Sequence, residues 1–169
     1  MSEPAQDVRG WAEPPATADL VDQYGDQLAS VAAPFRSFGG RPRFFGEVVT
    51  IKCFEDNALL KQTLAEYPQP QGKVLVIDGG GSYRAALVGD IIAGIAVDRG
   101  WSGLVVHGVV RDAVALGTLP IGIKALGTNP AKSSKTGAGQ ADIAVDIAGV
   151  TFRPGHWVYC DEDGIVTTR

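Results

Sequence analysis

The sequence predicts an α/β protein with a mixed sheet. Through the middle of the chain, apolar strand patterns alternate with helix patterns, and a strand–helix–strand order favours right-handed units with parallel strands. The final third changes to short strand patterns separated by Gly, Pro, Asn and Asp turns, which indicate antiparallel structure. This antiparallel end distinguishes the predicted fold from a regular Rossmann domain, in which strands and helices alternate.

The composition is that of one soluble domain. A chain of 169 residues suits a single sizeable core, and its 45% hydrophobic and 20% charged residues are ordinary for a globular protein. The net charge of −4 argues against direct nucleic-acid binding, because such proteins usually carry a basic face. No apolar stretch reaches the roughly 18 residues of a membrane helix, and the N-terminus lacks a secretion signal. We therefore expect a cytoplasmic protein with no membrane partner.

The N-terminal third predicts a tail, a helix and a strand. Residues 1–16 show no period and are expected to form a flexible tail. Thr17 is expected to cap a short helix over residues 18–25, which ends at a glycine. A Gly/Pro turn over Phe38–Arg43 leads to Phe45–Cys53, whose alternation predicts a strand with one wet face.

Helix and strand patterns alternate in the middle third. Leucines on one face predict a helix over residues 58–67, and the β-branched run Lys73–Ile77 predicts a strand buried on both faces. After a glycine loop, Ala85–Val88 is expected to be a short strand. A helix from Gly89 to Arg99 and a second buried strand over Gly103–His107 follow.

The last third is expected to hold one helical turn and several short strands. Residues 113–117 fit a single turn of helix. Hairpin corners are expected at residues 148–150 and at Pro154-Gly155. The predicted strands are Ile121–Leu126, Ile143–Ile147, His156–Cys160 and Ile165–Thr168.

Three glycines at residues 79–81 follow a predicted strand, which raises the hypothesis of a phosphate loop. A dinucleotide fingerprint needs G-x-G-x-x-G and a later acidic residue, and the second spacing fails here. The run from Gly127 to Gly139 resembles a P-loop only superficially, because the G-x-x-x-x-G-K-[ST] pattern is missing. We favour a loop that allows close approach of a ligand or a neighbouring subunit.

Gly89-Asp90 opens a predicted helix. The first N–H groups of a helix have no partner within it, and the helix dipole adds positive potential there. The amides of Asp90, Ile91 and Ile92 are therefore candidates for holding a carboxylate. The competing interpretation is that Asp90 only caps the helix and favours its dipole. The residues alone leave both interpretations open.

Arg111-Asp112 follows an apolar strand pattern, and strand ends are common places for ligand groups. Arginine binds carboxylates or stabilises an enolate oxygen, and aspartate is a ligand for Mg²⁺ or Mn²⁺. The competing interpretation is a surface salt bridge. One helix and one strand separate Gly89-Asp90 from Arg111-Asp112, so the segment is expected to bring them together as a site for a metal-bound keto acid. Lysines 124, 132 and 135 are interpreted as a solvated loop.

Several motifs together resemble the RraA-like family, which includes the regulator of ribonuclease activity A and the class II 4-hydroxy-4-methyl-2-oxoglutarate aldolases. The main similarity lies in GDII at 89–92, GWSGLVVHG at 100–108 and VRD at 110–112. The spacing from Gly89 to Arg111 also fits the family. Supporting similarity covers residues 17–20, 38–40, 53–57, 75–79, 124–130 and 163–165.

The resemblance implies one RraA-like domain over residues 17–169, with a compact α/β/β sandwich fold. It implies a ring-shaped homotrimer with sites near subunit boundaries. The amides of residues 89–92 and Arg111 would hold a pyruvate-like substrate. Asp112 would hold Mg²⁺ or Mn²⁺, directly or through waters, and Asp90 would orient a metal-bound water that moves the proton.

The activity that the resemblance implies is a metal-dependent carbon–carbon lyase acting on short 2-oxo acids. Retro-aldol cleavage of 4-hydroxy-4-methyl-2-oxoglutarate and decarboxylation of oxaloacetate both pass through a pyruvate enolate. The alternative is a non-catalytic regulator that binds an endoribonuclease of the ribonuclease E type. The family is also linked by name to menaquinone methylation, for which the sequence offers no methyl-donor loop.

One feature departs from the family's active aldolases, which carry a C-terminal acidic element that reaches a neighbouring site. This chain ends soon after residues 161–164, whose acidic side chains are interpreted as a turn rather than as that element. The departure affects the expected aldolase turnover more than metal binding or decarboxylation.

Overall fold

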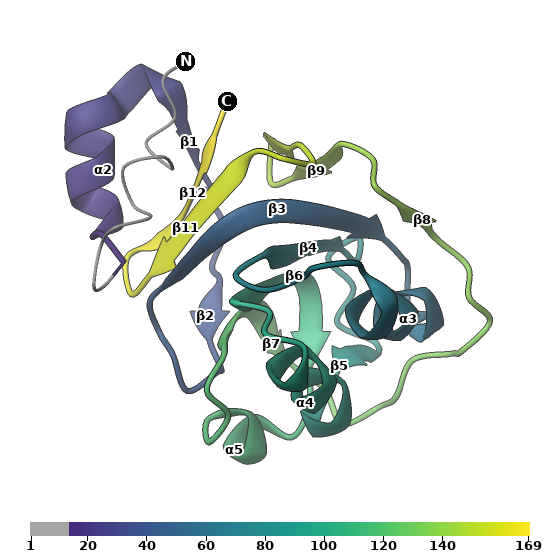
Figure 1. Ribbon diagram of the computed structural model, residues 1–169. Helices are drawn as coiled ribbons and strands as arrows, with labels where there is room; N and C mark the ends of the chain where they lie inside the picture. Colours follow the sequence, from purple (N-terminus) through teal and green to yellow (C-terminus); the bar gives the residue numbers. More distant parts are fainter. Residues whose placement is uncertain (1–13) are drawn as a thin grey trace.

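The structure is a computed structural model that describes residues 14–169 (Figure 1). The predicted tail over residues 1–16 lies, apart from its last three residues, outside the described residues. The helices are α2 (Thr17–Tyr24), the 3-10 turn η2 (Gly25–Gln27), α3 (Ala58–Glu66), α4 (Asp90–Asp98) and α5 (Ala113–Leu116). The strands are β1 (Leu28–Ser30), β2 (Arg36–Ser37), β3 (Phe44–Lys52), β4 (Val74–Asp78), β5 (Ala86–Val88), β6 (Gly103–Val110), β7 (Gly122–Thr128), β8 (Gln140–Ala141), β9 (Val145–Ile147), β10 (Val150–Phe152), β11 (Trp157–Asp161) and β12 (Gly164–Thr168).

The main sheet is mixed, as predicted. In the described part of the chain its order is β1-β12-β11-β3-β4-β6-β7-β2, with β5 paired to β6 and β8 paired to β3. Neighbours among β3, β4, β6 and β7 are parallel, and α3, α4 and α5 lie in the connections between them. The strands β11, β12 and β1 extend this parallel centre with antiparallel pairs.

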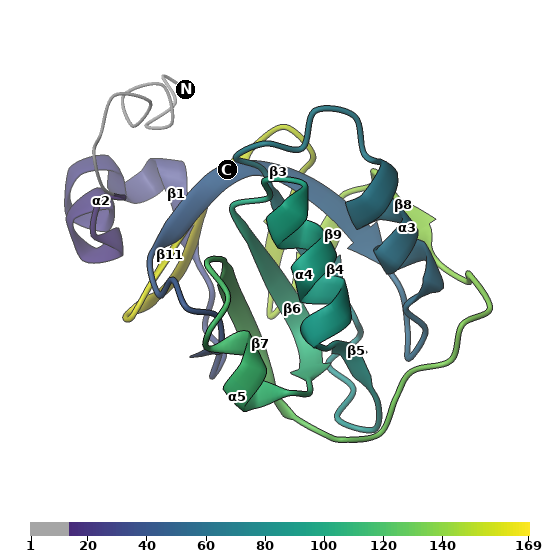
Figure 2. The ribbon, with the colours of Figure 1, turned by 60° about the horizontal axis from the view of Figure 1, so that its bottom comes forward.

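Hydrophobic cores lie on both faces of the parallel strands. Val49 and Ile51 of β3 belong to the core that also contains buried residues of α3 and α4. Figure 2 shows these two helices lying over the sheet. Val48 belongs to the second core, together with residues of β9 and β10. The wet face predicted for residues 45–53 is therefore wrong over Val48–Ile51, which is buried throughout because the antiparallel strands cover the second face.

Helix α2 packs against the antiparallel part of the sheet, where Leu20 joins a third buried cluster with Tyr159 and Val166. Thr17 is the first residue of this helix rather than its cap, so the predicted capping role is wrong. Its N–H and its hydroxyl both donate to the Asp161 carboxylate, each at 2.7 Å. The Thr17 hydroxyl, which would accept a backbone N–H in a helix cap, instead donates to this distant carboxylate.

The last third contains the predicted strands with shifts of one or two residues at their ends. The turn between β9 and β10 includes Gly149, whose φ of +79° suits a residue without a side chain. The acidic residues after β11 form the turn of the β11–β12 hairpin, as interpreted from the sequence. Strands β1, β2, β8 and β10, each three residues or fewer, are absent from the sequence prediction.

Residues 14–169 contain no helix that is both long enough and apolar enough to cross a membrane.

Candidate active site

The short strand β5 organises the candidate site. On one side, Val88 of β5 pairs with β6 and its carbonyl accepts the Arg111 N–H at 3.0 Å. On the other side, the Ala86 N–H donates to the Ala131 carbonyl at 2.7 Å, and the Ala86 carbonyl accepts the Ser133 hydroxyl at 2.8 Å. Figure 2 shows β5 close to the end of α4 where that helix begins. Strand β5 therefore has a partner at each edge, β6 at one and residues 131–133 at the other.

A pocket of about 340 Å³ opens at this place. Its size falls within the range of small-molecule sites, which runs from about 300 to 1,000 Å³. Every residue proposed from the sequence as a site residue lines it. The lining residues are Asn57, Lys61, Ala86, Gly89, Asp90, Ile91, Ile92, Arg111, Asp112, Lys132 and Lys135.

Asp112 contacts the beginning of α4. Its Oδ2 accepts the Asp90 N–H at 3.0 Å, so the expected approach of Gly89-Asp90 to Arg111-Asp112 is confirmed. The N-cap residue of α4 is Gly89, and Asp112 provides the carboxylate that a capping side chain would otherwise supply. The Asp90 N–H holds the pKa of the Asp112 carboxyl below its ordinary value, aided by the Asp90 side chain and Arg111 and opposed by desolvation.

The amides that follow are positioned to accept an anion. The first hydrogen bond of α4 runs from the Ala93 N–H to the Gly89 carbonyl at 3.0 Å. The N–H groups of Ile91 and Ile92 precede this bond, in the first turn where helix amides lack partners within the helix. Both residues line the pocket. The geometry matches the helix N-terminus at which anions bind.

Gly89 is required by close packing rather than by its backbone angles. Its φ of −126° is open to any residue. A Cβ at this position, however, would lie 2.6 Å from Asp112 Oδ2 and 3.3 Å from Arg111 Cγ. A side chain here would therefore push both the carboxylate and the arginine out of place.

Arg111 and Asp112 occupy a strained junction between β6 and α5. Asp112 has φ +58° and ψ +42°, a left-handed conformation in which aspartate and asparagine are enriched among non-glycine residues. The Arg111 Nη1 donates to the Pro130 carbonyl at 3.4 Å, which links the side chain to the segment after β7. The junction turns both side chains toward the pocket that they line.

Five lining residues were missed by sequence reasoning: Asn57, Lys61, Ala86, Lys132 and Lys135. The interpretation of lysines 124, 132 and 135 as one solvated loop is wrong for Lys124, which lies on β7 and is 2% exposed. Lys132 and Lys135 are exposed on the following loop, as interpreted, and they also line the pocket. A sequence signal for the loop lysines was their place just after a strand end.

Asp56 fixes the loop that carries these lysines. This buried carboxylate accepts the Thr136 N–H at 2.6 Å, the Thr136 hydroxyl at 2.7 Å and the Gly137 N–H at 3.1 Å. The hydroxyl of Thr136, with the backbone amides, lowers the pKa of Asp56 to about 2 against the opposing effect of burial. The loop is therefore fastened to the turn that precedes α3.

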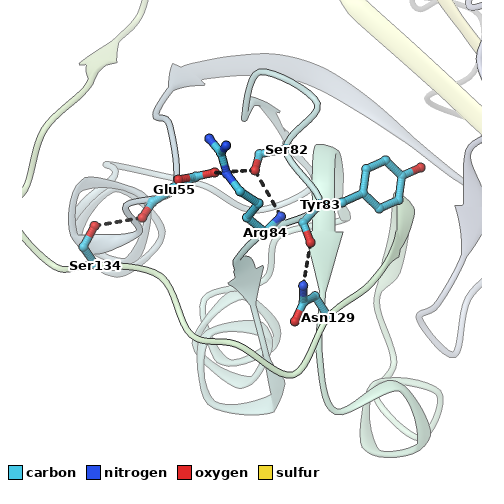
Figure 3. A network of polar contacts seen from close by, with 6 residues as sticks. All are labelled: Glu55, Ser82, Tyr83, Arg84, Asn129 and Ser134. Atoms are coloured by element: carbon cyan, nitrogen blue, oxygen red, sulfur yellow. Dashed lines mark hydrogen bonds and ion pairs between the residues drawn. The ribbon is translucent and has the colours of Figure 1, made fainter.

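A second set of contacts holds the loop from Gly79 to Arg84 in place (Figure 3). Glu55 Oε2 accepts the Ser82 hydroxyl at 2.5 Å and Arg84 Nε at 2.6 Å, and these contacts lower the pKa of Glu55. Asn129 Nδ2 donates to the Tyr83 carbonyl at 2.6 Å. The loop thus joins the turn after β3 to the segment after β7.

The glycines of this loop serve the chain's own packing. A Cβ on Gly79 would lie 2.7 Å from the His107 carbonyl, and one on Gly80 would lie 2.8 Å from the Phe54 ring. None of the three glycines lines the pocket. The close approach expected at residues 79–81 is therefore made by His107 and Phe54 of the same chain.

The donor set fits a hard divalent cation bound with few protein ligands. The carboxylates of Asp90 and Asp112 line the pocket, and residues 14–169 hold no cluster of three or more His, Cys, Asp or Glu side chains placed to bind a metal. Mg²⁺ is commonly bound through one or two carboxylates and completes its shell with waters and substrate oxygens. Two carboxylates beside an anion-binding helix end match that mode.

The chain is similar to known proteins over most of its length. The family model "RraA-like: Aldolase/RraA" matches residues 17–167. A protein of Laribacter hongkongensis (strain HLHK9), named "Putative 4-hydroxy-4-methyl-2-oxoglutarate aldolase", is 52% identical over 152 residues, which are 90% of this chain and 94% of that protein.

Solved structures are similarly close. One from Geobacillus kaustophilus HTA426, described as S-adenosylmethionine: 2-dimethylmenaquinone methyltransferase, is 45% identical with a TM-score of 0.89, covering 91% of this chain and 94% of its own. The structure of the RNA-processing inhibitor RraA from Thermus thermophilis is also 45% identical, with a TM-score of 0.87, covering 91% and 92%. On the family match and the 52% identical relative, this chain belongs to the RraA-like family.

Proposed function

We propose that this protein is a divalent-metal-dependent lyase that acts on short 2-oxo acids through a pyruvate enolate. The observation that carries the proposal is the convergence of the α4 amides, Arg111 and Asp112 on one pocket. The name of the 52% identical relative, an aldolase of a 2-oxo dicarboxylic acid, supports the same reaction class.

Different residues bind different groups of the substrate. The amides of Ile91 and Ile92 bind the carboxylate beside the 2-oxo group, as a helix N-terminus binds anions. Arg111 donates hydrogen bonds to the 2-oxo oxygen, where negative charge develops as the carbon–carbon bond breaks. Asp112 holds Mg²⁺ or Mn²⁺, and the bound ion supplies Lewis-acid polarisation of the same oxygen.

Both candidate reactions balance at this site. In 4-hydroxy-4-methyl-2-oxoglutarate the C3–C4 bond breaks, its electrons form the enolate, the C4 hydroxyl loses a proton and the enolate C3 gains one, giving two pyruvates. In oxaloacetate the C3–C4 bond breaks with loss of carbon dioxide, and C3 gains a proton. Asp90, at the first position of α4, is placed to orient the water that moves these protons.

We also propose that three copies form a ring with the pockets near their boundaries. Ile91 and Val114, at the beginnings of α4 and α5, are apolar side chains that are 73% and 89% exposed. Contact with a second copy would cover them. Light scattering at micromolar protein is expected to give three times the chain mass, and a monomer mass would contradict this assembly.

A second candidate function is regulation of an endoribonuclease of the ribonuclease E type. The 45% identical structure described as an RNA-processing inhibitor supports it, and the net charge of −4 suits docking to basic segments. A pull-down with such a ribonuclease is expected to show association that weakens with salt. The absence of any association at low salt would contradict the regulator.

Methyl transfer to a menaquinone is not proposed. A methyl-donor site would need a glycine-rich loop, and Gly79, Gly80 and Gly81 do not line the pocket.

Pyruvate release from oxaloacetate tests the lyase directly. The wild type and Asp112→Ala are compared with Mg²⁺ and with EDTA, after subtraction of the decarboxylation that free metal causes unaided. Turnover that EDTA abolishes and that the variant lacks is expected. Rates equal to the metal background in the wild type would contradict the proposal, and 4-hydroxy-4-methyl-2-oxoglutarate is the next substrate after a positive result.

A further inference from the structure

The pocket carries more positive charge than the proposed chemistry uses. Among the described residues that line it, Lys61, Arg111, Lys132 and Lys135 are cationic, and two aspartates are acidic. The whole chain has a net charge of −4, so the excess is local. Arg111 serves the 2-oxo group in the proposed function, which leaves the lysines without a role.

The lysines come from α3 and from the loop after β7, which contacts β5 at Ala86. Arg111 is fixed to the edge of β5 that pairs with β6, through the Val88 carbonyl. The Leu87 carbonyl accepts Asn57 Nδ2 at 3.2 Å, and Ala86 forms a β-bridge with Lys132. The lining of the pocket therefore has two parts, which we call the α4 end (residues 89–92 with Arg111 and Asp112) and the lysine end (Asn57 with Lys61, Lys132 and Lys135), and they meet where Arg111 Nη1 contacts the Pro130 carbonyl.

Lys135 is held at this second end before any ligand arrives. Its Nζ donates to Asn57 Oδ1 at 3.2 Å, and Asn57 is only 7% exposed. The hydrogen bond from Asn57 Nδ2 to the Leu87 carbonyl fixes which way the amide faces. The neighbouring Thr136 is bound by Asp56 through both its N–H and its hydroxyl.

The other two lysines are anchored through their backbones to the same framework. The Lys61 N–H donates to the Asn57 carbonyl at 3.0 Å, which places Lys61 one helical turn after Asn57. Lys132 is bridged to Ala86, and the next residue, Ser133, is 4% exposed and bonded to the Ala86 carbonyl. Three lysines from two separate segments thus line the pocket.

We propose that Lys135, positioned by Asn57, binds the second carboxylate of a dicarboxylate 2-oxo acid, with Lys61 and Lys132 strengthening the positive field there. The inference rests on the proposed function and makes it more specific. The proximal carboxylate and the 2-oxo group occupy the α4 end, and the carboxylate at C5 reaches the lysine end. The lysine ammonium group, on its flexible side chain, makes a charge-assisted hydrogen bond to a carboxylate without the planar two-donor geometry that arginine requires.

The test compares two ligands that differ only in the second carboxylate. Neither 2-oxoglutarate nor 2-oxopentanoate can undergo the cleavage, and the two share a five-carbon chain. Binding of each to the Mg²⁺-loaded protein is measured by calorimetry for the wild type, Lys135→Met and Lys135→Arg. The wild type is expected to prefer 2-oxoglutarate by about tenfold, the size of one charge-assisted hydrogen bond.

Lys135→Met is expected to remove this preference and leave the affinity for 2-oxopentanoate unchanged, whereas Lys135→Arg keeps part of it. The matched control is Lys52→Met, which removes an exposed lysine at the end of β3 that does not line the pocket. A preference that survives Lys135→Met would overturn the inference. Equal wild-type affinities for the two ligands would also overturn it while leaving the lyase standing, and failure to bind either ligand would count against both proposals.

Discussion

The carboxylate of Asp112 accepts the backbone N–H of Asp90 at 3.0 Å across 22 residues of sequence. The side chain proposed to hold the metal therefore also satisfies the first turn of α4. The same residue adopts a left-handed backbone conformation at the start of α5. A substitution at Asp112 acts on charge, helix capping and backbone strain together, and different replacements separate these effects.

Asp112→Asn removes the negative charge and keeps both the hydrogen bond to the Asp90 N–H and the left-handed backbone conformation. The asparagine amide oxygen still accepts the Asp90 N–H, and asparagine tolerates the left-handed conformation. We expect lyase activity to fall by about 100-fold or more, the usual size for loss of one electrostatic contact to the reacting oxygen. The urea midpoint is expected to stay near that of the wild type. Asp112→Ala should lose activity and also unfold at lower urea, and equal midpoints for the two variants would contradict the capping role.

Gly89→Ala tests the close packing at the beginning of α4. The added Cβ would meet Asp112 Oδ2 at 2.6 Å, so we expect a folded protein with weakened Mg²⁺ binding and little activity. Gly94→Ala is the control, because it lies in the same helix with no atom within 4 Å of an added Cβ. This control is expected to keep activity and to gain about 0.5–1 kcal/mol of stability. Full activity in Gly89→Ala would show that the packing is unimportant.

Asp56 makes stability depend on acid pH. The pKa of Asp56 in the folded protein is about 2, below its ordinary value of 3.8. The ionised carboxylate therefore stabilises the fold fully above pH 3.8, and this stabilisation is lost as the pH falls toward 2. Between about pH 4 and pH 2, the free energy of unfolding should decline more steeply for the wild type than for Asp56→Asn. Urea unfolding at several pH values measures both slopes. Asp26→Asn, an exposed site in η2, is expected to follow the wild type, and parallel slopes for Asp56→Asn would refute the assignment.

Thr17→Val tests how α2 is attached to the sheet. Valine has the shape of threonine but leaves Asp161 Oδ1 without the hydroxyl that lies 2.7 Å away. Thr17 and Asp161 are 4% and 3% exposed, and Oδ1 keeps the Asp163 N–H at 2.9 Å, so we expect a loss of about 1.5–3 kcal/mol, the size of one hydrogen bond to a charged group. Thr118→Val, at an exposed turn, is the control and should cost little. Equal unfolding free energies for the two variants would contradict the buried role of Asp161.

The sequence could predict the half of the site that lies within one strand–helix–strand unit. Gly89 and Arg111 are separated by one helix and one strand, and local patterns place both at the same edge of the sheet. Lys135 is different, because its partner Asn57 lies 78 residues away. A lysine among turn residues looks the same in a solvated loop and in a loop that closes over a pocket.

The errors in the fold have a similar physical origin. Thr17 has the local pattern of a helix cap, but a carboxylate 144 residues away takes its hydroxyl. Strand β1 has only three residues, and its pairing with β12 rather than its own sequence makes it a strand. The wet face expected in β3 is buried by strands that come a hundred residues later. Local periodicity carries no information about such distant partners.

The lysine-bearing loop also sets the order in which this pocket can come into being. The walls of the pocket come from α3, β5, the beginning of α4, the β6–α5 junction and residues 132–135. The contacts of Asp56 with this loop need the chain to have reached Gly137. During synthesis the parallel strands and α4 can assemble earlier, since their contacts are closer in sequence. A nascent chain therefore passes through a stage with the α4 end formed and the lysine end missing. The pocket is therefore complete only after about four fifths of the chain has been made, and a product truncated before Gly137 would lack both the lysine end and the strands β9, β10 and β11 that cover the second face of the parallel strands.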